Sequence, residues 1–128
     1  MLGLLCLPAA AASQETEPLL RLEEPPPLVA GQRATLVAVV ELGPELPLLL
    51  TPHTEGTALA SVRGRLLRGD AFDETARPLR FPIPVVARAA GTAILRVQLT
   101  SFRCDEANEC VPVEAEASLT LRIQPTAP

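Results

Sequence analysis

Aromatic residues are scarce in this chain of 128 residues, which has three phenylalanines, no tyrosine and no tryptophan. A hydrophobic core must therefore be built from Leu, Val, Ile and Ala. Apolar residues make up 48 % of the chain, which excludes a mostly disordered protein. The length suffices for one domain with a sizeable core.

Lysine is absent, so all eleven basic residues are arginine, and the net charge is −4. The arginines are scattered and have almost no aromatic neighbours, which argues against a nucleic-acid-binding surface. No stretch of about 20 apolar residues follows the N-terminal segment, so we expect no membrane span in the mature chain.

Histidine and cysteine are also rare, with one histidine, His53, and three cysteines. A single histidine without a nucleophile and carboxylate at informative spacing excludes a hydrolase with a Ser/His/Asp triad. A structural zinc site needs four ligands, which this chain does not offer at the usual spacing. We expect neither a metal site nor another cofactor.

The first 12 residues resemble the end of a secretory signal, with an apolar run and small residues before a cleavage site after Ala12. Cleavage there would remove Cys6 and leave Cys104 and Cys110. An even cysteine count suits an oxidising compartment. We therefore expect a periplasmic or otherwise extracytoplasmic protein.

The remaining chain divides into a lead-in rich in proline and glutamate, residues 13–27, and a folded domain, residues 28–124. Fourteen prolines and seven glycines favour short strands and turns over long helices. We expect about seven strands or more in an all-β, immunoglobulin-like antiparallel β-sandwich. The main expected strands cover residues 34–42, 46–51, 58–62, 79–85, 92–102 and 111–123, with those at 46–51 and 79–85 at sheet edges because they contain proline.

Strict alternation on both sides of the segment Cys104-Asp-Glu-Ala-Asn-Glu-Cys110 predicts which way the two cysteines face. Apolar residues occupy the odd positions of both flanking strands, as in strands with one face on a core. Both cysteines occupy even positions. If no bulge interrupts the pleat, the pair lies on the polar face, where a thiol of another protein can reach it.

Two interpretations of this cysteine pair remain open. The first is an inert disulfide that staples a hairpin. Closing so short a loop contributes only about 2–2.5 kcal/mol, at the low end for disulfides. The second is a redox-active pair, which needs an open path for thiolate attack on a sulfur.

Charged neighbours would set the reactivity of such a pair. Arg103 beside Cys104 would stabilise a thiolate, whereas Asp105, Glu106 and Glu109 would oppose it. Because acidic residues outnumber the basic one, we expect a slow relay specific for its partner rather than a general oxidant.

Two phenylalanines are candidates for shielding the sulfurs. Phe102 projects on the same strand face as Cys104, and Phe72 lies in a polar loop, residues 68–75, that is free to fold over the pair. Ordinary packing is the alternative role for both rings.

The segment from Ala90 to Pro112 resembles the N-terminal, periplasmic, immunoglobulin-like domain of the thiol–disulfide interchange protein DsbD. It shares a glycine turn, an alternating strand, two cysteines with five residues between them, and a proline two places after the second cysteine. Phe81-Pro-Ile-Pro84 stands where that family has a leucine-proline-valine strand. The resemblance covers residues 28–124, and its specific part is residues 79–124.

This resemblance implies a cysteine pair that cycles between dithiol and disulfide. Electrons would come from a membrane electron-transfer protein through a thioredoxin-like protein, and pass to periplasmic disulfide-containing proteins or to cytochrome c maturation. It implies Cys110 as the thiol that attacks substrate disulfides and Cys104 as the resolving thiol. It also implies a cap loop, with Phe72 as its aromatic residue and Asp70 or Asp73 as a nearby carboxylate.

The chain departs from the family in lacking tyrosine and in carrying Leu46-Pro-Leu-Leu-Leu50 where the family has a tyrosine-containing strand. The membrane and thioredoxin-like domains are absent from this sequence. The leading hypothesis is a free-standing protein-disulfide reductase component. The alternatives are a binding or structural module with an inert hairpin disulfide, and an accessory module of a secretory assembly.

Overall fold

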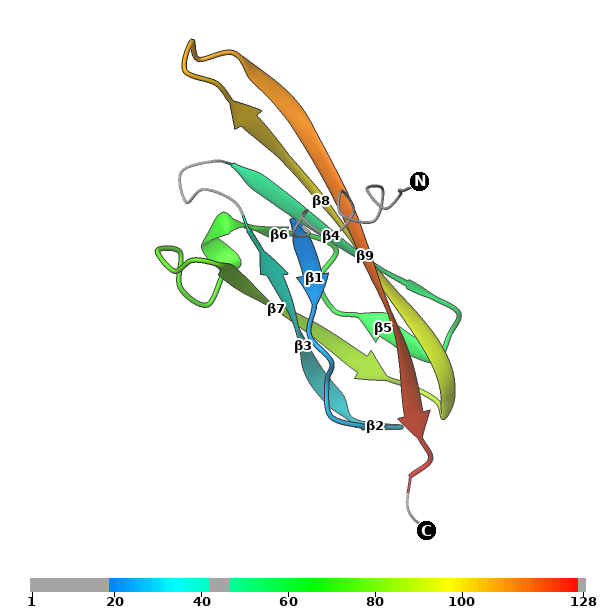
Figure 1. Ribbon diagram of the computed structural model, residues 1–128. Coiled ribbons are helices and arrows are strands. Elements are labelled where there is room, and N and C mark those ends of the chain that lie inside the picture. Colours follow the sequence, from blue (N-terminus) through cyan, green and yellow to red (C-terminus); the bar gives the residue numbers. More distant parts are fainter. Residues whose placement is uncertain (1–18, 42–46, 127–128) are drawn as a thin grey trace, which may run out of the picture.

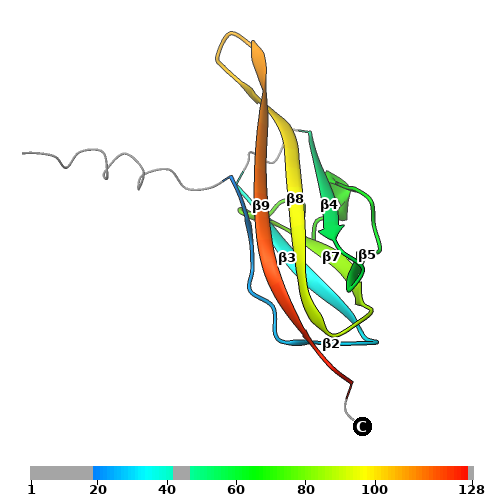
Figure 2. The ribbon, with the colours of Figure 1, turned by 90° about the vertical axis from the view of Figure 1, so that its right-hand side faces the viewer.

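Two β-sheets pack face to face in this protein, whose computed structural model describes residues 19–41 and 47–126 (Figures 1 and 2). The first sheet has four strands in the order β1-β3-β7-β5, and the second has five in the order β2-β9-β8-β4-β6. This all-β sandwich agrees with the fold class predicted from the sequence. The strands are β1 (Leu20–Leu22), β2 (Leu28–Val29), β3 (Arg33–Val40), β4 (Leu48–Glu55), β5 (Leu59–Ser61), β6 (Leu66–Leu67), β7 (Leu79–Ala87), β8 (Gly91–Cys104) and β9 (Cys110–Gln124).

Alternation along the long strands places one face of each sheet in the shared core. In β8 the odd positions from Ala93 to Leu99 are buried, and the even ones are half-buried or exposed. Phe81 is the only aromatic side chain in this otherwise aliphatic core of the described residues. Burying such side chains is the main favourable term for the fold, at about 1.5–3 kcal/mol for each large one.

The proline-containing strand β7 is not an outermost strand, contrary to the prediction, because it lies between β3 and β5. Its pairing with β5 covers only Val85–Ala87, however. The carbonyl oxygens of Arg80 and Pro84 accept hydrogen bonds from loop amides on the side away from β3, each at 2.9 Å. Alternate residues point their amides to the same side of a strand. The missing amides of Pro82 and Pro84 therefore fall on the side away from β3, where β5 pairs with only three residues of β7.

Part of the predicted lead-in belongs to the sandwich. Leu20–Leu22 form β1, which pairs with β3, and Leu20 is buried in the core. The Glu23 amide donates to the Val37 carbonyl at 2.9 Å, and the Glu23 carboxylate pairs with Arg80 at 2.8 Å. The folded unit therefore begins before residue 28.

The strand predicted at 46–51 is longer than expected, because β4 continues to Glu55 along β8. It lies between β8 and β6 and is not an outermost strand, contrary to the prediction, although β6 pairs with it only at Leu49 and Leu50. Residues 42–46, where the preceding strand was predicted to end, lie outside the described residues.

Strands β8 and β9 form one continuous ladder of 14 residue pairs, from Gly91 opposite Ile123 to Cys104 opposite Cys110. Strand β4 accompanies β8 only up to Ser101, whose hydroxyl donates to the Pro47 carbonyl at 2.6 Å. Beyond Ser101 the two strands continue alone as a two-stranded arm, residues 102–112, which projects past the rest of the sandwich (Figures 1 and 2).

Candidate functional site

The two cysteines form a disulfide at the outer end of this arm, with their sulfurs 2.07 Å apart. They are directly opposite each other in the ladder, and their Cα atoms are 4.0 Å apart. Both residues are exposed. No bulge interrupts the β8–β9 register, so the even positions keep their outward direction up to the cysteines, as the alternation predicts.

The five residues between the cysteines form a tight turn that is held by Asp105. The Asp105 amide donates to the Glu109 carbonyl at 3.0 Å, and the Asn108 amide donates to the Asp105 carbonyl at 3.0 Å. One carboxylate oxygen of Asp105 accepts from the amides of Ala107 and Glu109, both at 2.9 Å. Asn108 has a φ of 65°, in the left-handed region that asparagine tolerates better than most residues.

Asp105 therefore has a structural role that the sequence analysis missed, since it treated this residue only as a negative charge near the sulfurs. Aspartate at the first position of a turn and asparagine at a left-handed position are a recognisable hairpin signal. That signal was present in the sequence.

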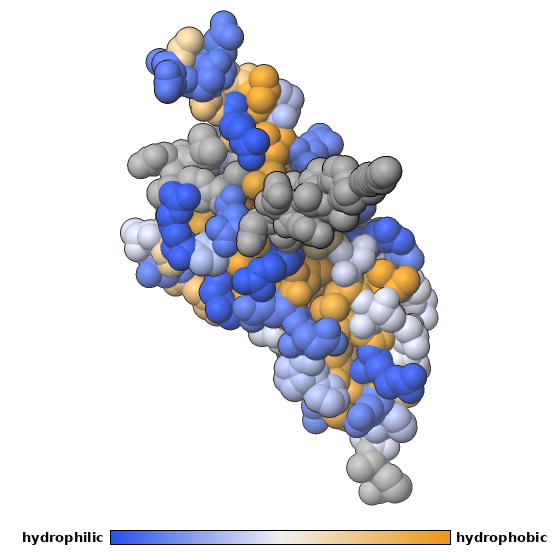
Figure 3. All heavy atoms as spheres, viewed as in Figure 1, coloured by the Kyte–Doolittle hydropathy of each residue, from blue (hydrophilic) through white to orange (hydrophobic). Residues whose placement is uncertain are grey.

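Phe102 and Pro112 are the neighbours of the disulfide on the outward face of the arm. They are opposite each other two positions before the cysteines in the ladder, and Phe102 is 42 % exposed. A shallow, open hollow beside the disulfide is lined by Cys104, Asp105, Glu106 and Ala107. Figure 3 shows hydrophilic residues gathered at the tip of the arm, with hydrophobic ones directly below them.

The charged residues predicted near the sulfurs lie in the turn or on the face of the arm away from the disulfide. Arg103 occupies an odd position opposite Val111, so its side chain leaves from the face opposite the disulfide. Glu106 and Glu109 are exposed in the turn. Glu109 also occupies an odd position, so alternation directs its side chain to the same face as Arg103, away from the disulfide.

The predicted cap residue Phe72 does not contribute to the lining of this hollow. Its amide donates to the Arg80 carbonyl at 2.9 Å, which holds its loop against the first residues of β7 in the other sheet. The Phe72 side chain is 60 % exposed. In this structure the sulfurs are therefore open to solvent rather than covered by that ring.

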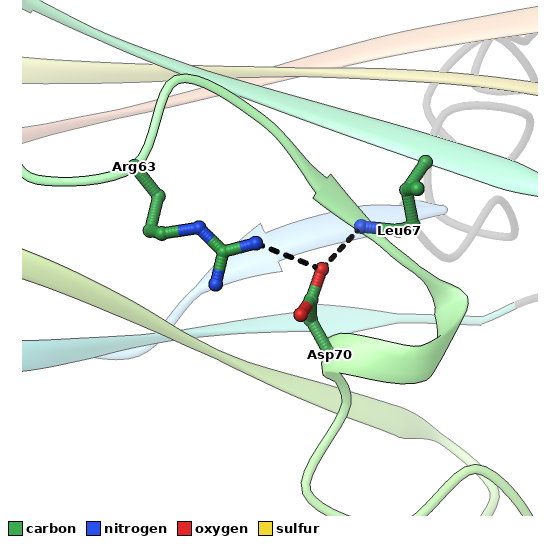
Figure 4. Close-up of polar contacts among 3 residues, drawn as sticks. All are labelled: Arg63, Leu67 and Asp70. Atoms are coloured by element: carbon green, nitrogen blue, oxygen red, sulfur yellow. Dashed lines mark hydrogen bonds and ion pairs between the residues drawn. The ribbon is translucent and has the colours of Figure 1, made fainter.

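Asp70 and Asp73, the other predicted neighbours, bond to residues close to them in sequence rather than lying near the sulfurs. The Asp70 carboxylate accepts the Leu67 amide at 2.8 Å and pairs with Arg63 at 3.3 Å (Figure 4). The hydrogen bond from the Leu67 amide is the main reason that the pKa of Asp70 lies below its usual value, and the positive charge of Arg63 lowers it further. Asp73 accepts from the hydroxyl and amide of Thr75 at 2.7 and 2.9 Å, and both bonds lower its pKa.

An exposed disulfide is open to exchange with an incoming thiolate. Within residues 19–41 and 47–126 no group of three or more His, Cys, Asp or Glu side chains could hold a metal ion. The same part of the chain has no helix that is long and apolar enough to span a membrane.

Comparison with protein-family models gives no match to this chain, and comparison with curated proteins gives none either.

Proposed function

We propose that this protein is an extracytoplasmic thiol–disulfide exchange domain that works through Cys104 and Cys110. It would pass electrons from a thioredoxin-like protein, supplied by a membrane electron-transfer protein, to disulfide-containing periplasmic substrates. The observation that carries this proposal is the exposed disulfide on the outward face of a two-stranded arm.

Access supports the proposal. Exchange requires the attacking thiolate to approach one sulfur along the sulfur–sulfur axis, with the second sulfur free to leave. On the arm, β8 has only β9 as a neighbouring strand among the described residues. A thioredoxin-like protein can therefore reach the disulfide without displacing any described element of the sandwich.

The small structural benefit of the bond is a second argument. Closure of this loop stabilises a chain by about 2–2.5 kcal/mol when nothing else holds it. Here the 14-pair ladder and the hydrogen bonds of Asp105 already define the hairpin. A disulfide placed for stability would contribute more between distant segments.

The proposed cycle balances in thiols and electrons. A thiolate of the reduced partner attacks one sulfur of the disulfide, which forms a mixed disulfide and frees the other cysteine. The second thiol of the partner then resolves the mixed disulfide, so the partner is oxidised and Cys104 and Cys110 become a dithiol. By the resemblance to the DsbD domain, Cys110 next attacks a substrate disulfide, and Cys104 displaces the reduced substrate as the pair reoxidises.

The alternative function is a binding or structural module whose hairpin disulfide is inert. The direct opposition of the cysteines in an unbroken ladder favours it, because a staple fits that position without a change in register. The two functions differ in the reduction potential of the disulfide in the folded protein.

The reduction potential is measured by equilibrating the native protein with thioredoxin or glutathione buffers and quantifying free thiols. We expect a potential above about −300 mV, since structural disulfides usually lie below that value. A bond that stays oxidised in these buffers while the domain remains folded would favour the inert module.

Trapping identifies the partner and tests the assigned order of attack. In a Cys104→Ser variant, Cys104 cannot resolve the mixed disulfide that Cys110 forms with the disulfide of an oxidised periplasmic substrate, so we expect this mixed disulfide to accumulate. Cys110→Ser is the matched control and should trap less, because the thiol that attacks substrate is gone. Equal trapping by both variants would contradict the assigned order.

A further inference from the structure

Four apolar side chains lie together on the outward face of the second sheet, where the arm begins. Leu67 of β6 is directly opposite Leu49 of β4, and Leu49 is directly opposite Thr100 of β8. Phe102 follows two positions after Thr100, on the same face of β8, and is opposite Pro112 of β9. We call the four side chains of Leu49, Leu67, Phe102 and Pro112 the base patch.

The base patch is accessible to solvent. Leu67 is 52 % exposed and Phe102 is 42 % exposed. Pro112 is exposed, and Leu49 is half-buried. Figure 2 shows β9, β8 and β4 side by side in front of the first sheet, so this face of the second sheet points away from the core. Single exposed apolar side chains are common, whereas a group of them marks an interaction site.

The base patch is continuous with the disulfide. Cys104 and Cys110 follow on the same face, two positions from Phe102 and Pro112. With about 3.4 Å per residue and about 4.8 Å between strands, Leu67 lies about 17 Å from Cys104 along the sheet. A protein partner typically covers about 800 Å², a footprint roughly 30 Å across. One partner can therefore cover the base patch while its thiolate reaches a sulfur.

A shallow hollow between β8 and β9 borders the base patch. Its outward side chains are Gln98, Thr100, Glu114 and Glu116. Glu116 also lines a neighbouring hollow together with Arg96, whereas Glu114 is exposed opposite Thr100. Among the described residues, the lining of the first hollow includes two carboxylates and no basic side chain. Its charge is therefore complementary to a basic side chain of a partner.

We infer that the thioredoxin-like protein that reduces the disulfide docks over the base patch, with an apolar surface around its reactive cysteine and a basic side chain beside Glu114. This inference rests on the proposed function and adds the surface that the partner recognises. It assigns Phe102 to contact with the partner, rather than to shielding of the sulfurs from small thiols. An apolar centre with charged groups at the rim is the usual arrangement of a protein interface.

Two reductants separate recognition from the reactivity of the bond. Reduced thioredoxin must make a protein contact to deliver its thiolate, whereas dithiothreitol is small enough to reach the exposed sulfurs without one. The measured quantity is the ratio of the second-order rate constants of thioredoxin and dithiothreitol for reduction of the native protein. We expect a Phe102→Ser, Leu67→Ser double variant to lower this ratio roughly tenfold, as truncation of central contact residues does at other interfaces.

A Val62→Ser, Val111→Ser double variant is the matched control, because it also removes two exposed apolar side chains. Val62 is 51 % exposed and lies beside β7 of the first sheet, where its amide donates to the Pro84 carbonyl at 2.9 Å. Val111 is 57 % exposed on the face of the arm opposite the disulfide. The control should keep the ratio of the unaltered protein. Thermal unfolding of both double variants checks that the sandwich is intact.

Two blocked peptide thiols test the charge of the hollow. Cys-Leu-Val-Arg in extended form spans about 10 Å between its first and last residues, and its arginine side chain extends the reach towards Glu114. We expect it to react roughly threefold or more faster than Cys-Leu-Val-Glu, and we expect Glu114→Gln to reduce this preference. Glu41→Gln, at an exposed position after β3, removes the same charge elsewhere and should keep the preference.

Four results would overturn the inference. The first is an unchanged ratio in the Phe102→Ser, Leu67→Ser variant. The second is a lower ratio that comes only from faster reduction by dithiothreitol, which would assign Phe102 to shielding. The third is equal reaction of the two peptides with the unaltered protein. The fourth is a dimer in solution that the same double variant dissociates, which would mean that a second copy covers the base patch.

The two reductants also distinguish failure of this inference from failure of the proposed function. If thioredoxin and dithiothreitol both reduce the native protein but the base patch has no effect, the exchange function stands and the docking surface is wrong. If neither reductant reduces the native protein, the proposed function is wrong and the inference falls with it.

Discussion

Three aspartates of the described loops accept backbone hydrogen bonds from residues close to them in sequence. Asp70 holds the Leu67 amide, Asp73 holds the Thr75 amide, and Asp105 holds the amides of Ala107 and Glu109. Short acidic side chains commonly stabilise turns in this way. Asp105 therefore matters for the conformation of the turn through its hydrogen bonds, and not only as a negative charge near the disulfide.

Replacement of Asp105 by alanine removes the acceptor of two turn amides, and we expect the tip of the arm to loosen locally. Amide exchange at Ala107 and Glu109 should accelerate about fivefold or more, which corresponds to a loss of about 1 kcal/mol. Glu106→Ala, at an exposed neighbour with the same charge, is the control and should change these rates little. Equal effects of the two substitutions would mean that charge, rather than the hydrogen bonds, determines the order of the turn.

Asp70 gives a pH dependence whose sign follows from its lowered pKa. A carboxyl with a lower pKa in the folded state than in the unfolded state stabilises the fold above its unfolded pKa, near 3.8. That contribution is lost as the pH falls through the folded value. We expect Asp70→Asn to lower the free energy of unfolding at pH 7 by about 0.5–1 kcal/mol, because the pair with Arg63 is partly exposed.

Urea unfolding of both proteins from pH 7 to pH 2 measures this effect. The difference between them should shrink below about pH 4, as the carboxylate of the unaltered protein becomes protonated. A difference that is constant over the whole range would show that Asp70 acts through packing rather than through its charge.

At the scale of elements, the arm is a hairpin supported by one sheet at its base and by its own turn at its tip. Ser101 is the last residue of β8 that pairs with β4. Beyond it the Phe102–Pro112 pair, the disulfide and the Asp105 turn follow in order. The disulfide is thereby held at a fixed place while both of its cysteines stay outside the core.

Removal of both cysteines tests how little the arm contributes to global stability. We expect a Cys104→Ser, Cys110→Ser double variant to stay folded and to lose at most about 2.5 kcal/mol in denaturant unfolding. Leu99→Ala, at a fully buried position of the same strand, should cost more, about 2–5 kcal/mol. If the double variant were unfolded at room temperature, the disulfide would have the structural role of the alternative function.

The position of strand β7 in its sheet depends on its neighbouring strands. Pro82 and Pro84 indicated a side of β7 with few backbone hydrogen bonds, and most of that side indeed has no paired strand among the described residues. The sequence pattern of β7 did not reveal that the short strand β5 pairs with its last three residues, Val85–Ala87.

At the scale of the whole molecule, the sandwich is built almost entirely from aliphatic side chains. Both sheets contribute inward residues to one shared core, with Phe81 as the single large ring. Alternating strands can bury their apolar faces only against another such face, so two layers follow from the pattern. The arm, residues 102–112, is the part that extends beyond this requirement (Figure 1).

The sequence by itself determined the fold class and the direction in which the cysteines face. Both depend on a period of two along single strands, which is a local property of the extended backbone. The sequence also contained the turn signal of residues 105–109, an aspartate at the first position and an asparagine at the left-handed position.

Only the tertiary structure decided which strands lie side by side. It brought residues 20–22 of the lead-in into the first sheet, placed β7 between β3 and β5, and kept Phe72 out of the hollow beside the sulfurs. These outcomes depend on contacts between residues far apart in the chain. Many alternative pairings satisfy the same local pattern, and the packing of the whole core selects among them.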